Sequence, residues 1–355
     1  MTSTEETTGP IFLQSLRSAL GRVPLWLICS LVLVALSLPV GLLTYDTYSN
    51  AIGNQYEPGS LIRSLETNFV IDSSEERGEL NSTVAIVSSI SAALAMFIGI
   101  FAAGGWLQVF FQRTSGHSVR RFFHGGVRHF WRFFRVFLLV VVCAAVIQRV
   151  VYYEPWHALV ETSFLQLPDV APQGASVGPE YTSDRLEGVA DEYTARKIIW
   201  AQDGLHALLM ALLLTWAVYT RTRLAMHDAT SSIWAGLCTF FTMLRHPIKT
   251  LRPMLLLLLV EVVVVLLATS IHGWMEESLG PESSWKSVAM IFAVSTAVLV
   301  ISEIIHAARY QAAILVSRSV IGPISRPDPW KHSIGAPGGP QYPIIEGGDE
   351  YGVAL

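Results

Sequence analysis

The chain has 355 residues, of which 52% are hydrophobic and only 15% are charged, and its net charge is −4. A soluble domain carries about 25% charged residues, so this composition favours an integral membrane protein over a soluble one. The three cysteines, Cys29, Cys143 and Cys238, have no CxxC spacing and lie outside the predicted outer loops. Their positions argue against disulfides and against a structural zinc site.

Six apolar stretches are long enough to cross a bilayer, because roughly 20 residues of helix span its hydrocarbon core. They comprise residues 24–43, 82–111, 134–153, 198–220, 253–273 and 287–308. The first has no signal-peptidase site after Pro39, and we expect it to remain in the protein as an anchor. The fold class that we predict is all-α, a polytopic membrane protein with six transmembrane helices.

The distribution of Lys and Arg predicts the orientation of these spans. Alternate connecting segments hold 17 and 6 basic residues, and the poorly basic ones also carry 18 acidic residues. We therefore predict that both termini are cytoplasmic, in a bacterial plasma membrane. The predicted parts are an amphipathic helix (1–23), a membrane domain (24–321) with outer loops at 44–81, 154–197 and 274–286, and a flexible cytoplasmic tail (322–355).

Two basic segments resemble each other and predict an internal repeat. The first is Arg128-His129 with Arg132 and Arg135, and the second is Arg245-His246 with Lys249 and Arg252. All four positions share one offset of 117 residues. The repeated unit would be an amphipathic helix, a span, an outer loop and a second span. Whether residues 11–23 begin a third copy stays open.

Three stretches carry a resemblance to known proteins: GGW at 104–106, FFHGGVRHFWRFFR at 122–135 and ARYQAAILVSRS at 308–319. They resemble uncharacterised bacterial six-span membrane proteins. In layout, most of 11–320 is similar to the membrane domain found beside glycerophosphodiester phosphodiesterases. The resemblance implies a helical membrane fold, but it implies no activity and carries over no catalytic residue.

Ionisable residues inside a bilayer are costly and mark functional candidates. Glu261, Glu303 and His306 lie at similar depth and form a predicted polar cluster that could relay protons or bind a cation. The alternative is a neutral Glu261 that is hydrogen-bonded to a neighbouring helix.

Nearer the outer surface, Arg149 and Asp203 could form an ion pair, or each could reach water separately. Asp203 and Glu303 differ in depth by on the order of 15 Å. We therefore expect no metal site, and no motif indicates a cofactor.

Basic residues interleaved with aromatic ones lie next to two spans and predict helices at the lipid interface, on anionic headgroups, rather than a nucleic-acid site. The residues concerned are Arg120, Arg121, Arg128, Arg132, Arg135, Arg245, Lys249 and Arg252.

A face of small side chains in the second span favours close helix packing, either within the chain or against a protein partner or second copy. Its residues are Ser91, Ala95, Gly99 and Ala103.

No catalytic motif occurs in the sequence, and we expect no enzymatic activity. The function that we predict is that of an accessory or structural subunit of a membrane assembly. The alternatives are a transporter of a small solute, lipid or ion that uses intramembrane acidic residues, and a lipid-modifying intramembrane enzyme. A connected polar path through the membrane would favour the transporter, and a fully packed bundle would favour the subunit.

Overall fold

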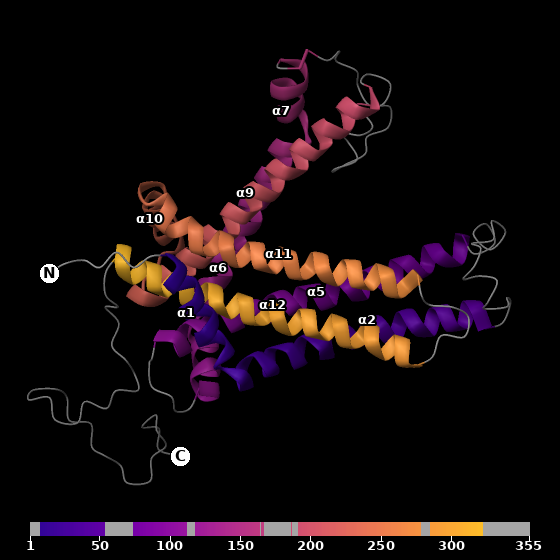
Figure 1. Cartoon of the computed structure of the whole chain (residues 1–355), viewed down its shortest axis with the longest axis horizontal. Coiled ribbons are helices and arrows are strands. Elements are labelled where there is room, and N and C mark those ends of the chain that lie inside the picture. The colour runs from indigo at the N-terminus through magenta and orange to yellow at the C-terminus, as the bar shows by residue number, and fades with distance from the viewer. Residues whose placement is uncertain are drawn as a thin grey trace, which may run out of the picture. The chain divides into compact units, whose positions relative to one another are not determined.

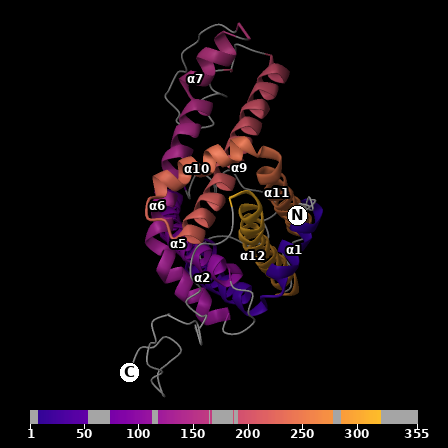
Figure 2. The same cartoon turned by 90° about the vertical axis from the view of Figure 1, so that its left-hand side faces the viewer.

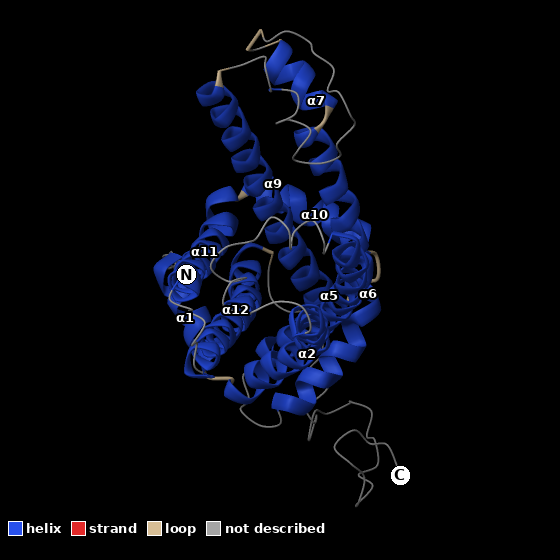
Figure 3. Ribbon diagram, turned by 90° about the vertical axis from the view of Figure 1, so that its right-hand side faces the viewer, coloured by secondary structure: helices blue, strands red, loops and turns tan. Residues whose placement is uncertain are grey.

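The computed structural model describes residues 8–53, 74–111, 118–163, 165–166, 186, 191–277 and 285–321. Within these ranges every regular element is a helix (Figure 1, Figure 3). Six helices are long and apolar enough to cross a membrane, which confirms the predicted all-α fold with six spans. The predicted tail, from 322 on, and most of the predicted outer loops lie outside the described residues.

The elements follow one another along the chain in a simple order. They are α1 (Thr8–Leu20), α2 (Val23–Gly53), α5 (Ser74–Phe111), α6 (Ser118–Tyr152), α7 (Glu154–Trp156), the π-helix η1 (His157–Thr162), α9 (Glu192–His227), α10 (Ser232–Arg245), α11 (Pro247–Glu277) and α12 (Trp285–Val320). The six spans belong to α2, α5, α6, α9, α11 and α12.

Several helices extend beyond the apolar stretches that the sequence singles out. The helix α6 contains the first basic segment and its span without a break, and α12 continues to Val320 rather than ending near residue 308. The reason is that hydropathy locates the apolar part of a helix, whereas backbone hydrogen bonding continues through polar residues that favour helix. The start of α9 is fixed locally, because the Asp191 carboxylate accepts a hydrogen bond from the Thr194 N–H at 3.2 Å. That hydrogen bond lowers the pKa of Asp191.

The packed core lies at one end of the helix bundle, which we call the basic end. Here α1, α10, the first turns of α6 and the last turns of α12 come together (Figures 1 and 2). The helix α12 packs against five others, namely α1, α2, α5, α9 and α11. The largest fully buried side chains include Trp106, Phe133, Leu257, Ile305 and Tyr310. The last turns of α12 are thus the centre around which the other helices assemble.

Away from the basic end, the spans cover one another much less. The four helices α2, α5, α11 and α12 extend together, while the hairpin of α6 and α9 diverges from them (Figures 1 and 2). Only 6–28% of each span's most apolar window is buried, and α5 has the smallest share. We call these parts, on the side away from the basic end, the distal halves of the spans.

Glycines of α5 and α6 allow these two helices to pack closely against each other. A Cβ atom added at Gly104 would lie 2.6 Å from the carbonyl oxygen of Gly125, and one added at Gly126 would lie 2.5 Å from the Phe101 ring. A Cβ added at Gly105 would lie 2.5 Å from the Phe122 ring. Only the absence of side chains allows these two helix backbones to approach so closely.

The predicted small-residue face of α5 lies mostly elsewhere. Ala103 is fully buried, but Ser91, Ala95 and Gly99 are only half-buried. A Cβ added at Gly99 would meet nothing within 4 Å. Of these four residues, only Ala103 is packed tightly within the described chain, and the other three are partly exposed.

Candidate functional site

One face of α12 carries a stripe of polar side chains into the core. Glu303, His306 and Arg309 are spaced by three residues, and Tyr310 follows directly, so all four lie on neighbouring positions of one helical face. Because α12 is surrounded by other helices, these groups meet side chains from α9 and α11. Tyr310 is completely buried, and Glu303, His306 and Arg309 are half-buried.

Glu261 of α11 is bound by this stripe, although not by the residues that the sequence pairs with it. Its carboxylate forms an ion pair with the Arg309 guanidinium, and the two side chains are 25% and 15% exposed. The sequence places Arg309 in a cytoplasmic segment because the predicted sixth span ends at residue 308. The spacing Glu303-x-x-His306-x-x-Arg309 was the signal that could have included it.

A second polar group connects α12 to α9. The His306 and Tyr310 rings meet edge to face, with centroids 5.3 Å apart. The Tyr310 hydroxyl accepts a hydrogen bond from Arg221 Nη1 at 3.0 Å. Arg221 Nε is buried and has no hydrogen-bond partner among the described residues. Sequence reasoning missed Arg221 because the predicted fourth span ends at Thr220.

The predicted cluster is therefore divided between two groups of contacts. Glu261 pairs with Arg309, and His306 packs on Tyr310. Glu303 makes no hydrogen bond with any described residue. The described residues also contain no group of three or more His, Cys, Asp or Glu side chains that could hold a metal ion. The geometry suits a fixed polar core better than a chain of groups that exchange protons.

The two residues of the predicted outer ion pair have different partners in the structure. The Tyr152 hydroxyl donates to Asp203 Oδ1 at 2.7 Å, and the Arg149 guanidinium lies 4.3 Å above the centre of the Tyr153 ring. The neighbouring Gln202 side chain donates to the Val151 carbonyl at 2.6 Å. Hydrogen bonds, rather than an ion pair, thus join α6 and α9 here. Tyr152 and Tyr153 were not singled out from the sequence, because aromatic residues at the end of a span are common at the membrane surface whatever their contacts.

The predicted lipid-facing basic residues fall into two sets. Arg128 and Arg132 both bind the carboxylate of Asp228, Arg128 at 3.1 Å. Asp228 follows the last residue of α9 and has a left-handed backbone with φ of 50°. By contrast, Arg245, Lys249 and Arg252 are exposed and form no ion pair with any described residue. Arg120 is half-buried, Arg121 is buried and Arg135 is exposed.

The charge of Asp228 is maintained by the two arginines. Burial of the carboxyl acts to raise the pKa of Asp228, but the hydrogen bonds and positive charges of Arg132 and Arg128 outweigh it and lower that pKa. Asp228 is therefore ionised at neutral pH. Two arginines of the first basic segment are thus bound to a carboxylate of the same chain.

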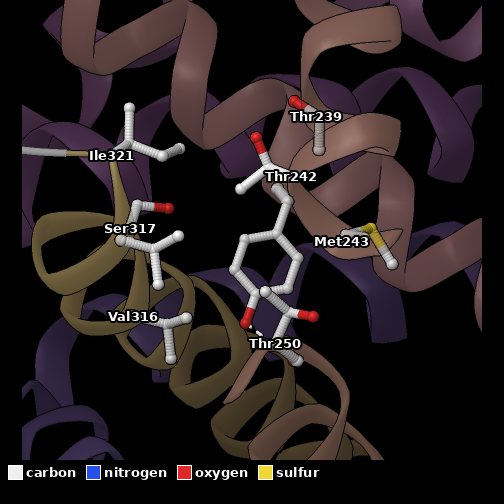
Figure 4. A pocket seen from close by; sticks show the side chains of 9 residues that line it. Thr239, Thr242, Met243, Thr250, Val316, Ser317 and Ile321 are labelled. Atoms are coloured by element: carbon white, nitrogen blue, oxygen red, sulfur yellow. Dashed lines mark hydrogen bonds between the residues drawn. The ribbon is translucent and has the colours of Figure 1, made fainter. Parts of the chain in front are cut away.

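A small hollow lies between α9, α10, α11 and α12 at the basic end (Figure 4). The Ser317 hydroxyl points into it and is buried, without a hydrogen-bond partner among the described residues. The Tyr219 hydroxyl donates to the Thr250 carbonyl at 2.8 Å, and the hydroxyls of Thr239 and Thr242 bond to carbonyls of their own helix. The hollow has room for about one water molecule, so it is too small for a substrate.

One further network was missed in the sequence. In the π-helix η1, His157 Nδ1 lies 3.0 Å from a carboxylate oxygen of Glu161, and His157 Nε2 lies 3.2 Å from the Thr162 hydroxyl. An acid, an imidazole and a hydroxyl are thereby linked. All three belong to a single turn of helix, so the network holds that turn together.

Comparison with known proteins adds no assignment to this geometry. No protein-family model matches the chain, and no curated protein and no solved structure is significantly similar to it.

Proposed function

We propose that the protein is a non-enzymatic integral membrane protein that serves as a subunit of a larger membrane assembly. The observation that carries the proposal is the open distal half of α5. Only 6% of its most apolar window is buried, Ser91 and Ala95 are only half-buried, and a Cβ atom added at Gly99 would meet nothing within 4 Å.

The physical argument rests on how helices associate in lipid. Apolar surface alone does not drive association, because lipid tails are as apolar as Leu side chains. Association needs backbones that can approach closely, which small residues spaced by four permit. The large side chains beside this face, Ile86, Ile90 and Leu94, are exposed. We infer that a transmembrane helix of a partner subunit packs on α5 at Gly99.

The polar core supports the same role. Glu261 is neutralised by Arg309, and Tyr310 joins Arg221 to His306 at the centre of the basic end. These contacts hold three helices, α9, α11 and α12, in one arrangement. A rigid basic end with open distal halves suits a subunit that offers surfaces to other helices.

The test is a single bulky substitution in the open face. Gly99→Leu should leave the melting temperature of the purified protein nearly unchanged, since a Cβ atom added there would meet nothing within 4 Å. It should abolish stoichiometric co-purification of the partner in mild detergent. Gly204→Leu in α9 is the matched control, because that position is also open, and it should retain the partner.

The outcomes separate the possible occupants of this face. An intact complex in the Gly99→Leu variant would contradict the proposal. If the purified complex contains only copies of this chain at every detergent concentration, the occupant of this face is a second copy of the chain and not a different subunit.

Transport is the second candidate function, and Glu303 is the observation that favours it. This carboxyl is half-buried in the membrane domain and has no hydrogen-bond partner among the described residues. If Glu303 and Glu261 serve coupling, Glu261→Gln and Glu303→Gln should each change ion or solute flux in reconstituted vesicles. The subunit proposal expects no flux in the wild-type protein and no change in either variant.

We further propose that the basic end faces the cytoplasm of a bacterial cell, with both termini inside. The support is the distribution of basic residues among the connecting segments. A cysteine at Thr230 should react with a membrane-impermeant reagent only after the cells are opened, whereas a cysteine at Gln166 should react in intact cells.

The internal repeat also remains a proposal, and the order of the helices is consistent with it. A short helix, α1 or α10, precedes the spans α2 and α11, and the basic first turns of α6 precede its span. Each is followed by one more span. The repeat would therefore have three units, each of an interfacial segment and two spans.

A further inference from the structure

The bend between α10 and α11, which we call the α10–α11 corner, carries three cations that no described residue neutralises. Arg245 is the last residue of α10, and Lys249 and Arg252 lie three positions apart on α11. All three are exposed and form no ion pair with any described residue. No Asp or Glu occurs between Asp228 and Glu261, so no acid lies nearby along the chain.

The helix α10 is turned so that its large apolar side chains face outward. Its buried residues are small, namely Ser232, Ala235, Gly236 and Thr239. Its exposed face is formed by Ile233, Trp234, Leu237, Phe240, Phe241 and Leu244. Trp234 is 68% exposed, and Ile248, just beyond the corner, is 73% exposed. In water this face would be strongly unfavourable, at about 25 cal/mol for each Å² of apolar surface.

A specific contact fixes this orientation of α10. The Trp216 indole N–H of α9 donates to the Gly236 carbonyl at 2.9 Å. A Cβ atom added at Gly236 would lie 2.7 Å from the same indole ring. The small face of α10 is therefore seated against α9, and the aromatic face is held outward.

We propose that the α10–α11 corner is a binding site for an anionic phospholipid. The phosphate is bound by Arg245, Lys249 and Arg252, because guanidinium and ammonium groups donate to phosphate oxygens. The acyl chains lie along Phe241, Leu244 and Ile248, on the exposed apolar face. The first backbone N–H groups of α11 point to the same corner and favour an anion there.

The first basic segment, which lies on α6, does not form a second lipid site. Its Arg128 and Arg132 are bound to Asp228, which already supplies the anion. The lipid site is thus restricted to one of two segments with the same basic spacing. It does not depend on the proposed subunit role, since a lipid can bind here whether or not a partner occupies α5.

The experiment compares two variants that lose the same number of charges. The full-length protein is reconstituted in nanodiscs of phosphatidylcholine with increasing phosphatidylglycerol, and thermal stabilisation and the number of retained phosphatidylglycerol molecules are measured. The test variant is R245Q/K249Q/R252Q. The control is R17Q/R22Q/R135Q, which removes three arginines of the basic end that form no ion pair with a described residue.

The corner variant should bind phosphatidylglycerol on the order of a hundredfold more weakly than the wild type, and the control should bind it normally. If the triple variant does not fold, Lys249→Gln alone should weaken binding several-fold. Equal losses in both triple variants would overturn the site in favour of general surface charge. Equal stabilisation by inorganic phosphate in phosphatidylcholine nanodiscs would overturn the lipid in favour of a free anion.

Discussion

The two basic segments of this chain share one spacing but differ in structure. The first, Arg128-His129 to Arg135, lies on an unbroken helix, and two of its arginines bind Asp228. The second, Arg245-His246 to Arg252, is divided between two helices, and its cations are exposed and form no ion pair within the described part of the chain. Equal charge patterns can therefore have different structural roles: the first binds an acid of a neighbouring helix end, and the second is exposed, where we propose that it binds lipid.

A single residue explains why one segment is bent. Pro247 follows His246, whereas the residue at the corresponding position after His129 is Phe130. The ring of a proline disfavours the helical conformation of the residue before it. His246 accordingly leaves the helix, with φ of −131° and ψ of 57°, and α11 begins at Pro247. His129 stays in the helix, buried, with its ring stacked on Phe133.

The largest effect should come from breaking the contact of α6 with α5 at Gly125, just before the first segment. We expect Gly125→Ala to reduce the free energy of unfolding by about 2–3 kcal/mol, because the new methyl group would overlap the Gln108 side chain and the Gly104 carbonyl. Gly99→Ala is the control and should be neutral or slightly stabilising, since Ala favours helix more than Gly does. Thermal unfolding in detergent, followed by tryptophan fluorescence, measures both. Equal losses of stability in the two variants would show that the glycine contact does not hold α6 against α5.

The next effect concerns the ion pairs of Asp228. We expect Asp228→Asn to cost about 1 kcal/mol, since the groups are partly exposed and screened by solvent. Asn keeps the shape of the side chain and tolerates the left-handed backbone of this position. With Arg128 and Arg132 released, the variant should also retain more phosphatidylglycerol than the wild type does. An unchanged lipid count would contradict the view that Asp228 is what keeps these arginines from lipid.

The difference in stability between the wild type and Asp228→Asn should depend on pH, because the pKa of Asp228 is lowered in the folded protein. The ionised carboxylate stabilises the folded state fully above its unfolded pKa of about 4. The contribution is lost as the pH falls through the folded value, which lies below that. Melting temperatures of the wild type and Asp228→Asn should therefore differ at pH 7 and converge as the pH falls below about 4. A constant difference down to pH 2 would exclude the ion pairs as its source.

The smallest effect on stability should come from Pro247→Ala. We expect a change below about 1 kcal/mol, but α10 should become more nearly continuous with α11. Spin labels at Thr230 and Leu259 should then move further apart, as pulsed electron paramagnetic resonance can measure. If the distance is unchanged, the contact of Trp216 with Gly236, rather than Pro247, maintains the corner. The double variant with Trp216→Phe separates these two contributions.

Part of the candidate site could be predicted from the sequence, and part could not. Glu261, Glu303 and His306 were found because ionisable residues are conspicuous in apolar stretches. Arg309 and Arg221 were missed because each lies one residue beyond the predicted end of its span. Hydropathy places the end of a span at the last apolar residue. The helix can nevertheless continue with a partly buried charged residue when a neighbouring helix supplies a partner, as Glu261 does for Arg309 and Tyr310 does for Arg221.

The sequence by itself determined that this is an all-helical chain with six spans, because length and apolar composition suffice to identify a helix that can cross a bilayer. Only the tertiary structure decided which polar groups meet. It paired Glu261 with Arg309 and Asp228 with Arg128 and Arg132, and it left the cations of the α10–α11 corner exposed, with no ion pair to a residue that the structure describes. The physical reason is that a partner across helices depends on the rotation of each helix about its axis. That rotation is set by packing contacts, such as those of Gly104 with Gly125 and of Trp216 with Gly236, which no local pattern of charge encodes.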